Sequence, residues 1–212
     1  MPKKETTLSF LAQFIPDGSF EMVEPYFRSH VIHFTITRER KTVLGDYRHP
    51  VTGKPHRISV NGSLNKFSFL ITLLHELAHL LTFNQFGNRV SPHGDEWKGI
   101  YRQVLIPFLG KSFFPPDVEK ALIAYLRDPA ASTCGDPRLF KALAKYDEKS
   151  EDMVMVDELV DNQFFATEDG NIYQKIEKRR TRTKCRHVKT GRMYLFPGIA
   201  MVIVCDPKDL RS

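Results

Sequence analysis

The hydrophobic and polar positions divide the chain into two parts with different patterns. The first part, up to about residue 150, mixes short strand-like runs with longer helical ones. Its strongest feature is 66–86, KFSFLITLLHELAHLLTFNQF, which is apolar on nearly every side of a helix. A helix that is hydrophobic all round is a buried helix, and Gly87 is suited to end it. The pattern therefore predicts a long core helix over 66–86.

Weaker patterns surround this core helix. Three runs rich in β-branched or aromatic residues predict strands of one small sheet, at 31–37, 42–47 and 56–61. A helix is expected to restart with Ser91 as its N-cap and Pro92 as its first helical residue. The remaining helices are expected at 3–15, 19–30, 115–128 and 136–149.

After about residue 150 the helical periodicity is lost. Short strand-like pieces follow one another to residue 205, and EDGN and KTGR between some of them are turn signals. We therefore expect an α+β fold, with a domain over 1–150 that combines a small sheet and helices. A small all-β, ribbon-like module is expected over 151–212.

Composition narrows the setting. Of 212 residues, 42% are hydrophobic and 26% are charged, as in ordinary globular proteins. The three cysteines are far apart and form no CxxC pair, which disfavours a disulfide framework or a cysteine-only zinc site and suits a reducing compartment. The sequence shows neither a signal-peptide core nor an apolar run typical of a membrane span. We expect a soluble cytoplasmic protein, with the nucleoid as one location and no membrane partner. The net charge of +6 mildly favours an anionic partner.

The segment HELAH, within the core helix, carries the clearest chemistry. Residues four apart lie on one helix face, so His75 and His79 can both direct an imidazole at one zinc ion. Glu76 would then hold a water at the open metal position and act as its general base. The alternative is that both histidines are hydrogen-bonded to backbone or carboxylate groups in the core, with Glu76 in an ion pair.

A catalytic zinc site usually needs a third protein ligand. The metzincin pattern HExxHxxGxxH is excluded, because Thr82 and Gln85 occupy the positions of its glycine and its third histidine. A helix that returns antiparallel to the core helix would bring His93 beside the metal. Asp95 and Glu96 are the alternatives for this ligand.

HELAH followed by HGDEW resembles the SprT-like family, which includes a eukaryotic protease that acts on DNA–protein crosslinks. The resemblance covers residues 31–110. It implies a zincin fold, one Zn²⁺ held by His75, His79 and His93, and peptide-bond hydrolysis with Glu76 as the catalytic residue. By the same resemblance, Glu96 and Trp97 are expected to pack around the metal ligands and hold them in place. The alternative for this pair is a first-turn acid that complements the helix dipole and an ordinary core tryptophan.

SprT-like proteins often carry a C-terminal zinc ribbon with two cysteine pairs, and this chain departs from that pattern. Cys185 is present, but no paired cysteines accompany it. We therefore expect the ribbon-like module to hold no metal, so that the chain binds one zinc ion.

A row of cations is the main feature of the second part. Basic residues recur at every second position, which in a strand would place them on one face: Lys178, Arg180, Arg182, Lys184 and Arg186. Such a row suits sequence-independent contacts with DNA phosphates, and Tyr173, Tyr194 and Phe196 are candidates for base stacking. The alternative is a solvated face that protects a sheet edge.

Two functions are consistent with these observations. The first is a SprT-like zinc metalloprotease acting on protein substrates, including proteins held at DNA. The second is a non-catalytic or latent zinc-containing module that associates with nucleic acid. The intact Glu76 favours the first, since a purely structural zinc site has no need of it. The other histidines are expected to be isolated surface or core residues: His30, His33, His49, His56 and His187.

Overall fold

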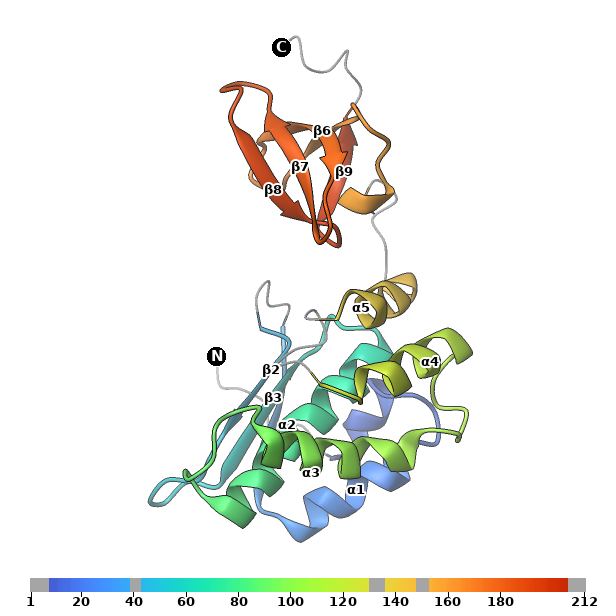
Figure 1. Ribbon diagram of the computed structural model, residues 1–212. Coiled ribbons are helices and arrows are strands. Elements are labelled where there is room, and N and C mark those ends of the chain that lie inside the picture. The colour runs from blue at the N-terminus through green and yellow to red at the C-terminus, as the bar shows by residue number, and fades with distance from the viewer. Residues whose placement is uncertain (1–7, 39–42, 130–135, 148–152, 206–212) are drawn as a thin grey trace. The chain divides into compact units, whose positions relative to one another are not determined.

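The computed structural model describes residues 8–38, 43–129, 136–147 and 153–205. The chain divides into two compact units, Met1–Asp147 and Glu148–Ser212. The first combines helices with a three-stranded sheet, and the second is built mainly from a six-stranded sheet (Figure 1). The chain therefore has the α+β character that the sequence predicts.

The first unit contains three strands, five α-helices and three 3₁₀-helices within the described residues. In chain order they are η1 (Leu8–Gln13), α1 (Phe20–Ser29), β1 (Ile32–Thr37), β2 (Gly45–Arg48), β3 (His56–Asn61), α2 (Lys66–Phe86), α3 (Asp95–Leu105), η2 (Ile106–Phe108), α4 (Pro116–Tyr125), α5 (Pro137–Leu143) and η4 (Ala144–Tyr146).

Helix α2 is the centre of this unit. The Asn65 side chain accepts hydrogen bonds from the backbone N–H groups of Phe67 and Ser68, which fixes the start of the helix. At the other end, Gly87 has a positive φ of 62° and donates its N–H to the carbonyl of Phe83. Between these caps α2 packs against α3 on one side and β2 and β3 on another (Figure 1). The predicted limits of 66–86 are confirmed.

The sheet of the first unit has the order β1-β3-β2, so β2 is an edge strand. Strand β3 pairs in parallel with β1 and antiparallel with β2. Because β2 also packs on α2, its residues lie along the same helix that carries HELAH.

Some element boundaries differ from the predicted ones. The helix expected over 3–15 is a 3₁₀-helix over Leu8–Gln13, and residues 1–7 lie outside the described ones. Strand β2 is shifted to Gly45–Arg48 from the expected 42–47, of which 42 is not described. Helices α4 and α5 end earlier than expected, at Tyr125 and Leu143, because each final turn tightens or unwinds, as helix ends commonly do.

The second unit has one antiparallel sheet with the strand order β4-β9-β5-β6-β7-β8. Its elements are β4 (Met153–Met155), η5 (Val156–Glu158), β5 (Phe164–Ala166), β6 (Ile172–Lys178), β7 (Arg182–His187), β8 (Met193–Pro197) and β9 (Met201–Cys205). Strand β4 is short, because the Glu158 carboxylate accepts the Met155 N–H and stabilises a 3₁₀ turn directly after it.

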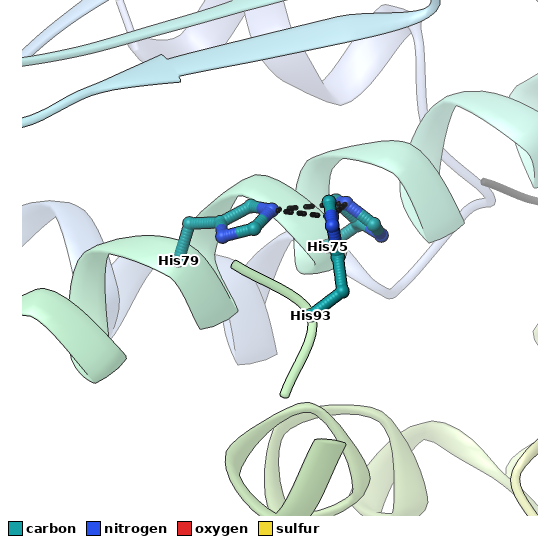
Figure 2. A group of neighbouring side chains, drawn as sticks. All are labelled: His75, His79 and His93. Atoms are coloured by element: carbon teal, nitrogen blue, oxygen red, sulfur yellow. Dashed lines mark hydrogen bonds between the residues drawn. The ribbon is translucent and has the colours of Figure 1, made fainter. Parts of the chain in front are cut away.

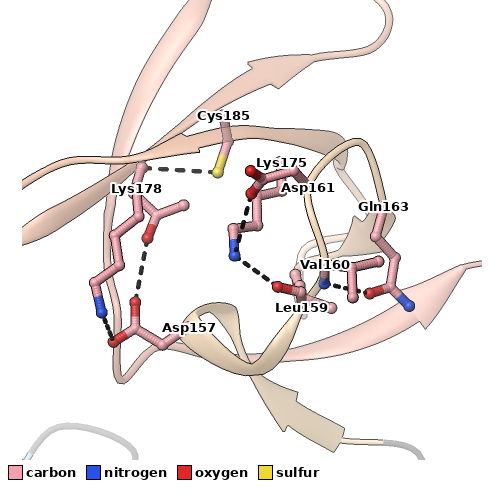
Figure 3. Close-up of polar contacts among 9 residues, drawn as sticks. Asp157, Leu159, Val160, Asp161, Gln163, Lys175, Lys178 and Cys185 are labelled. Atoms are coloured by element: carbon pink, nitrogen blue, oxygen red, sulfur yellow. Dashed lines mark hydrogen bonds and ion pairs between the residues drawn. The ribbon is translucent and has the colours of Figure 1, made fainter.

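A buried lysine joins two parts of this second unit. Lys175 lies on β6 opposite Cys185 of β7, and its side chain is only 7% exposed. Its ammonium group donates to the Leu159 carbonyl at 2.6 Å and lies 3.6 Å from the Asp161 carboxylate (Figure 3). These contacts offset the cost of burying a charge and attach the loop after η5 to the sheet.

Helix α2 is the one helix in the described part of the chain that is long and apolar enough to cross a membrane. Within it, 72% of the most apolar 18-residue window is buried inside the protein, as in the core helix of a folded domain.

Candidate metal centre

Three histidines from two segments converge beside α2. His75 and His79 project from adjacent turns of the helix, and His93 reaches them from the turn that precedes α3 (Figure 2). Their Nε2 atoms lie 3.1 Å apart for His75 and His93, 3.1 Å for His75 and His79, and 3.0 Å for His79 and His93. The three nitrogens thus face one common point, where they can hold a metal ion.

The backbone at His93 differs from the predicted one. The helix begins at Asp95 with Gly94 as its N-cap, so the expected start at Ser91 and Pro92 is wrong. His93 has a φ of +59°, in the left-handed region that a right-handed helix cannot contain. The Gly94 N–H instead donates to the Ser91 carbonyl at 3.0 Å, which closes a turn. This turn directs the His93 side chain back toward α2.

Trp97 packs against all three imidazole rings. It is fully buried, with ring centroids 4.6 Å from His75, 5.1 Å from His79 and 4.7 Å from His93. Tyr101, one turn further along α3, stacks on Trp97 and is also buried. These contacts limit the rotamers of the histidines and hold them in their converging arrangement.

Glu96, by contrast, is exposed in the first turn of α3. Within the described residues no hydrogen bond or ion pair joins it to the three histidines. Its place suits an acid that complements the helix dipole.

The histidines sit in an environment that keeps them neutral. Burial lowers the pKa of His75, and the neighbouring imidazoles of His79 and His93 lower it further. Burial also lowers the pKa of His79, to about 4, and that of His93. A neutral imidazole has a free lone pair, which is the form that binds a metal ion.

Glu76 lies beside this cluster and is only 5% exposed. Burial raises its pKa to about 8, and the nearby Asp46 carboxylate acts in the same direction. A Cβ atom added at Gly45 of β2 would lie 2.5 Å from the Glu76 Oε1 atom and 2.7 Å from the Thr72 methyl group. The edge strand therefore approaches the carboxylate so closely that only glycine fits there.

A cleft of about 730 Å³ opens above the histidines and Glu76. Residues of β2 and its flanks, one side of α2, the turn before α3 and the start of α3 form its walls: Val43, Leu44, Gly45, Asp46, Tyr47, His49, Thr72, His75, Glu76, His79, Thr82, Phe83, Gly87, Asn88, Val90, Ser91, Pro92, His93 and Trp97. The candidate metal centre is thus accessible to a ligand from solvent.

Two histidines near this cleft have ring partners that the sequence does not reveal. His49 and His56 were expected to be isolated, yet His49 stacks on Phe83 and His56 contacts the hydroxyl of Tyr47. Only the pairing of β2 with β3, and of both with α2, brings these residues together. The alternation of Gly45, Tyr47 and His49, along β2 and the residue that follows it, was the available signal.

The cationic row of the second unit does not lie on one strand. Lys178 ends β6, opposite Thr183 of β7, and the chain reverses around Arg180, so the prediction of a single five-residue row is wrong. Only Arg182, Lys184 and Arg186 alternate along β7, on the face opposite its buried residues.

Several of these cations have local partners. Lys178 pairs with Asp157 at 2.8 Å (Figure 3), and Lys184 lies 3.6 Å from Glu177. Arg186 donates to the neutral side-chain amide of Gln174.

Of the three aromatic residues considered for base stacking, two face the core of the second unit. Tyr173 is buried, and Phe196 packs against it with ring centroids 4.8 Å apart. Tyr194 is 42% exposed. Only Tyr194 therefore retains a surface broad enough for stacking.

The close approach of Gly45 to Glu76 makes a testable pair of substitutions. Gly45→Ala should lower the free energy of unfolding of the first unit by about 1–3 kcal/mol, because the methyl group overlaps Glu76 and Thr72. Gly99→Ala, in the interior of α3 with nothing within 4 Å of its added methyl, should raise it by about 0.5–1 kcal/mol. Denaturant unfolding followed by the fluorescence of Trp97, the only tryptophan, measures both. Equal effects of the two substitutions would contradict the packing described.

Comparison with known proteins indicates similarity to the same family as the HELAH and HGDEW motifs. The model of the SprT-like family matches residues 21–113. The chain is 34% identical over 85 residues to Protein SprT of Glaesserella parasuis, covering 38% of this chain and 51% of that protein. It is 55% identical over 42 residues to Protein SprT of Yersinia pestis, covering 19% of this chain and 24% of the relative.

These matches span between about a quarter and a half of the length of those relatives. No solved structure matches the chain. The resemblance to the SprT-like family that HELAH and HGDEW indicate is confirmed over residues 21–113.

Proposed function

We propose that the first unit is a zinc-dependent metallopeptidase domain of the zincin type. One observation carries this proposal: three neutral imidazoles converge on one point at the floor of an open cleft, beside a buried carboxylate. His75, His79 and His93 would hold the metal, and Glu76 would be the catalytic residue. The family match over 21–113 supports the same assignment.

The residues present fit a zinc ion. Zn–N distances of about 2.0–2.1 Å in a tetrahedral site separate the ligand nitrogens by about 3.3–3.4 Å, close to the 3.0–3.1 Å between the Nε2 atoms. Three imidazole ligands suit zinc, and the cleft leaves the fourth direction open. When bound, zinc would polarise a carbonyl group and lower the pKa of a water molecule.

Glu76 is suited to move a proton in this setting. A carboxylate held beside the metal position can take a proton from a water molecule and return it to the departing amine nitrogen. Its burial against Gly45 and Thr72 limits its rotamers, so that it stays next to the histidines. Trp97 and Tyr101 pack against the His75 ring and help to hold it in place.

Nucleic acid is the second partner that we propose, bound by the second unit. From Lys178 to Cys205 the sequence has eight lysines and arginines and no acidic residue. Arg182 and Arg186 are exposed on one face of β7, and Arg180 lies in the adjacent turn. These cations would bind phosphates without reading sequence and would keep the peptidase near proteins held at DNA.

The metal site makes the first prediction. The purified protein should contain one zinc ion per chain. Loss of a residue that only supports a metal ligand typically weakens metal binding by about 10–100-fold. His93→Ala removes a ligand itself and should weaken zinc binding by more than that. The matched control, His33→Ala on β1, should leave the zinc content unchanged. Elemental analysis and competition with a chelator measure both. Full zinc content in the His93 variant would assign the third ligand to Asp95 or Glu96 instead.

The catalytic assignment makes the second prediction. Glu76→Gln should retain zinc and reduce peptide hydrolysis by about 10²-fold or more, because the amide cannot accept the proton. Hydrolysis of an unfolded protein substrate, followed by mass spectrometry beside the zinc content, is the measurement. An unchanged rate in this variant, or no hydrolysis by the zinc-loaded native chain, would favour a non-catalytic or latent zinc module.

The nucleic-acid assignment makes the third prediction. Replacing Arg180 and Arg182 by Glu should weaken binding to DNA and reduce the slope of log K against log salt by about 1 for each arginine that binds a phosphate in the native chain. Arg138→Glu, on α5 of the first unit, is the control and should have little effect. Fluorescence anisotropy at two or more salt concentrations tests this. Binding that does not depend on salt would exclude the phosphate contacts.

A further inference from the structure

The cleft has two ends with different chemistry. Thr72, Glu76 and Asp46 line one end, which is polar. The other end extends past His79 along α2 and is formed largely by aromatic and apolar side chains: Tyr47, His49, Phe83 and Val90. The metal-binding assignment uses none of these four residues.

Aromatic rings form a continuous wall at this second end. The Tyr47 ring lies parallel to that of His79, within 5° and 6.2 Å between centroids. His56 packs on Tyr47 at 5.9 Å and on the edge of Phe83 at 6.1 Å. His49 stacks on Phe83 within 7° and 4.9 Å. The wall therefore runs from the candidate metal ligand His79 to the far end of the cleft.

The Tyr47 hydroxyl and one ring nitrogen each of His49 and His56 already have partners in the protein. The Tyr47 hydroxyl lies 3.0 Å from the His56 Nδ1 atom, and the His49 Nδ1 atom lies 3.0 Å from the Pro50 carbonyl oxygen. The rings consequently present their apolar faces, and few hydrogen-bonding groups, to a ligand. Flat side chains gain most from such surfaces, through burial and ring–ring contacts.

The charges of the cleft favour a peptide over a nucleotide. Among the described residues, the cleft lining includes the acidic residues Asp46 and Glu76 and neither lysine nor arginine. Apart from the proposed zinc ion, a nucleotide phosphate would find no cation in that lining, and the Asp46 carboxylate would repel it.

We propose that Tyr47, His49 and Phe83 form a specificity subsite that receives an aromatic side chain of a polypeptide, next to the peptide bond presented to Glu76. This inference rests on the proposed peptidase function and names its substrate class. The stacking of Tyr47 on His79 places the subsite directly beside the candidate metal centre. Tyr47 and Phe83 would pack against the substrate ring, and His49 would close the outer end.

Binding to an inactive chain tests the subsite separately from catalysis. The zinc-loaded full chain with Glu76→Gln is titrated with two labelled peptides that differ only in a central Phe or Ala. Fluorescence anisotropy should show the Phe peptide binding about tenfold more tightly, since its ring is buried on the wall. Equal affinities, or no binding of either peptide, would overturn the inference.

Further substitutions in the Glu76→Gln chain show which residues cause the preference for the Phe peptide. Phe83→Ala and His49→Ala should each reduce it to about threefold or less, and His49, which is exposed, should be replaceable without loss of folding. Phe10→Ala is the matched control, because Phe10 is an exposed aromatic residue outside the cleft lining, and it should keep the full preference. Tyr47→Phe should also keep it, because the ring remains. A preference unchanged in both the Phe83 and His49 variants would exclude the subsite.

The outcomes separate this inference from the proposed function. Hydrolysis by the native chain without enrichment of aromatic residues at the cleavage sites would keep the peptidase and overturn the subsite. Preferential binding of the Phe peptide without hydrolysis by the native chain would keep the subsite and overturn the peptidase. Displacement of the Phe peptide by a mononucleotide would show a nucleobase site and overturn the peptide assignment.

Discussion

The burial of α2 is the constraint on which the first unit depends. A helix that is covered on nearly all sides can carry imidazoles and a carboxylate only if their surroundings compensate for the loss of water. His75, Glu76 and His79 lie on the part of α2 that faces the cleft, between the edge strand and the turn before α3. The same burial keeps the imidazoles neutral. Core packing and the chemistry of the site therefore have one origin, because the helix that fills the core also sets the protonation of the residues it presents.

The parts of this unit that the sequence predicts well are those governed by local rules. The limits of α2 follow from the Asn65 and Gly87 caps and from the apolar run between them, and the extent of β3 follows from its alternating residues. The HELAH spacing likewise places two histidines on one helix face. The left-handed conformation of His93 is different, because Ser91 and Pro92 carry a convincing helix-start pattern. At His93 the chain instead forms a turn, in which the His93 ring packs on Trp97 and the other histidines.

Long-range pairing limits prediction elsewhere. The aromatic wall of the cleft joins residues of β2, β3 and α2, and no sequence periodicity links them. In the second unit, alternating cations predicted one strand, but the chain reverses after Lys178, so two strands share them. The buried Lys175 was likewise unforeseen, because a lysine in an alternating strand reads as exposed. In each case the strand register, which depends on contacts far apart in sequence, decides the outcome.

The packing of Trp97 on all three histidines has an optical consequence. The chain contains one tryptophan, so its tryptophan emission comes from a single indole in contact with the candidate ligands. Any event that reorients those imidazoles or changes their charge alters the surroundings of that indole directly. The protein therefore carries a built-in fluorophore at its candidate metal centre, through which occupancy of the cluster can be followed in solution without a label.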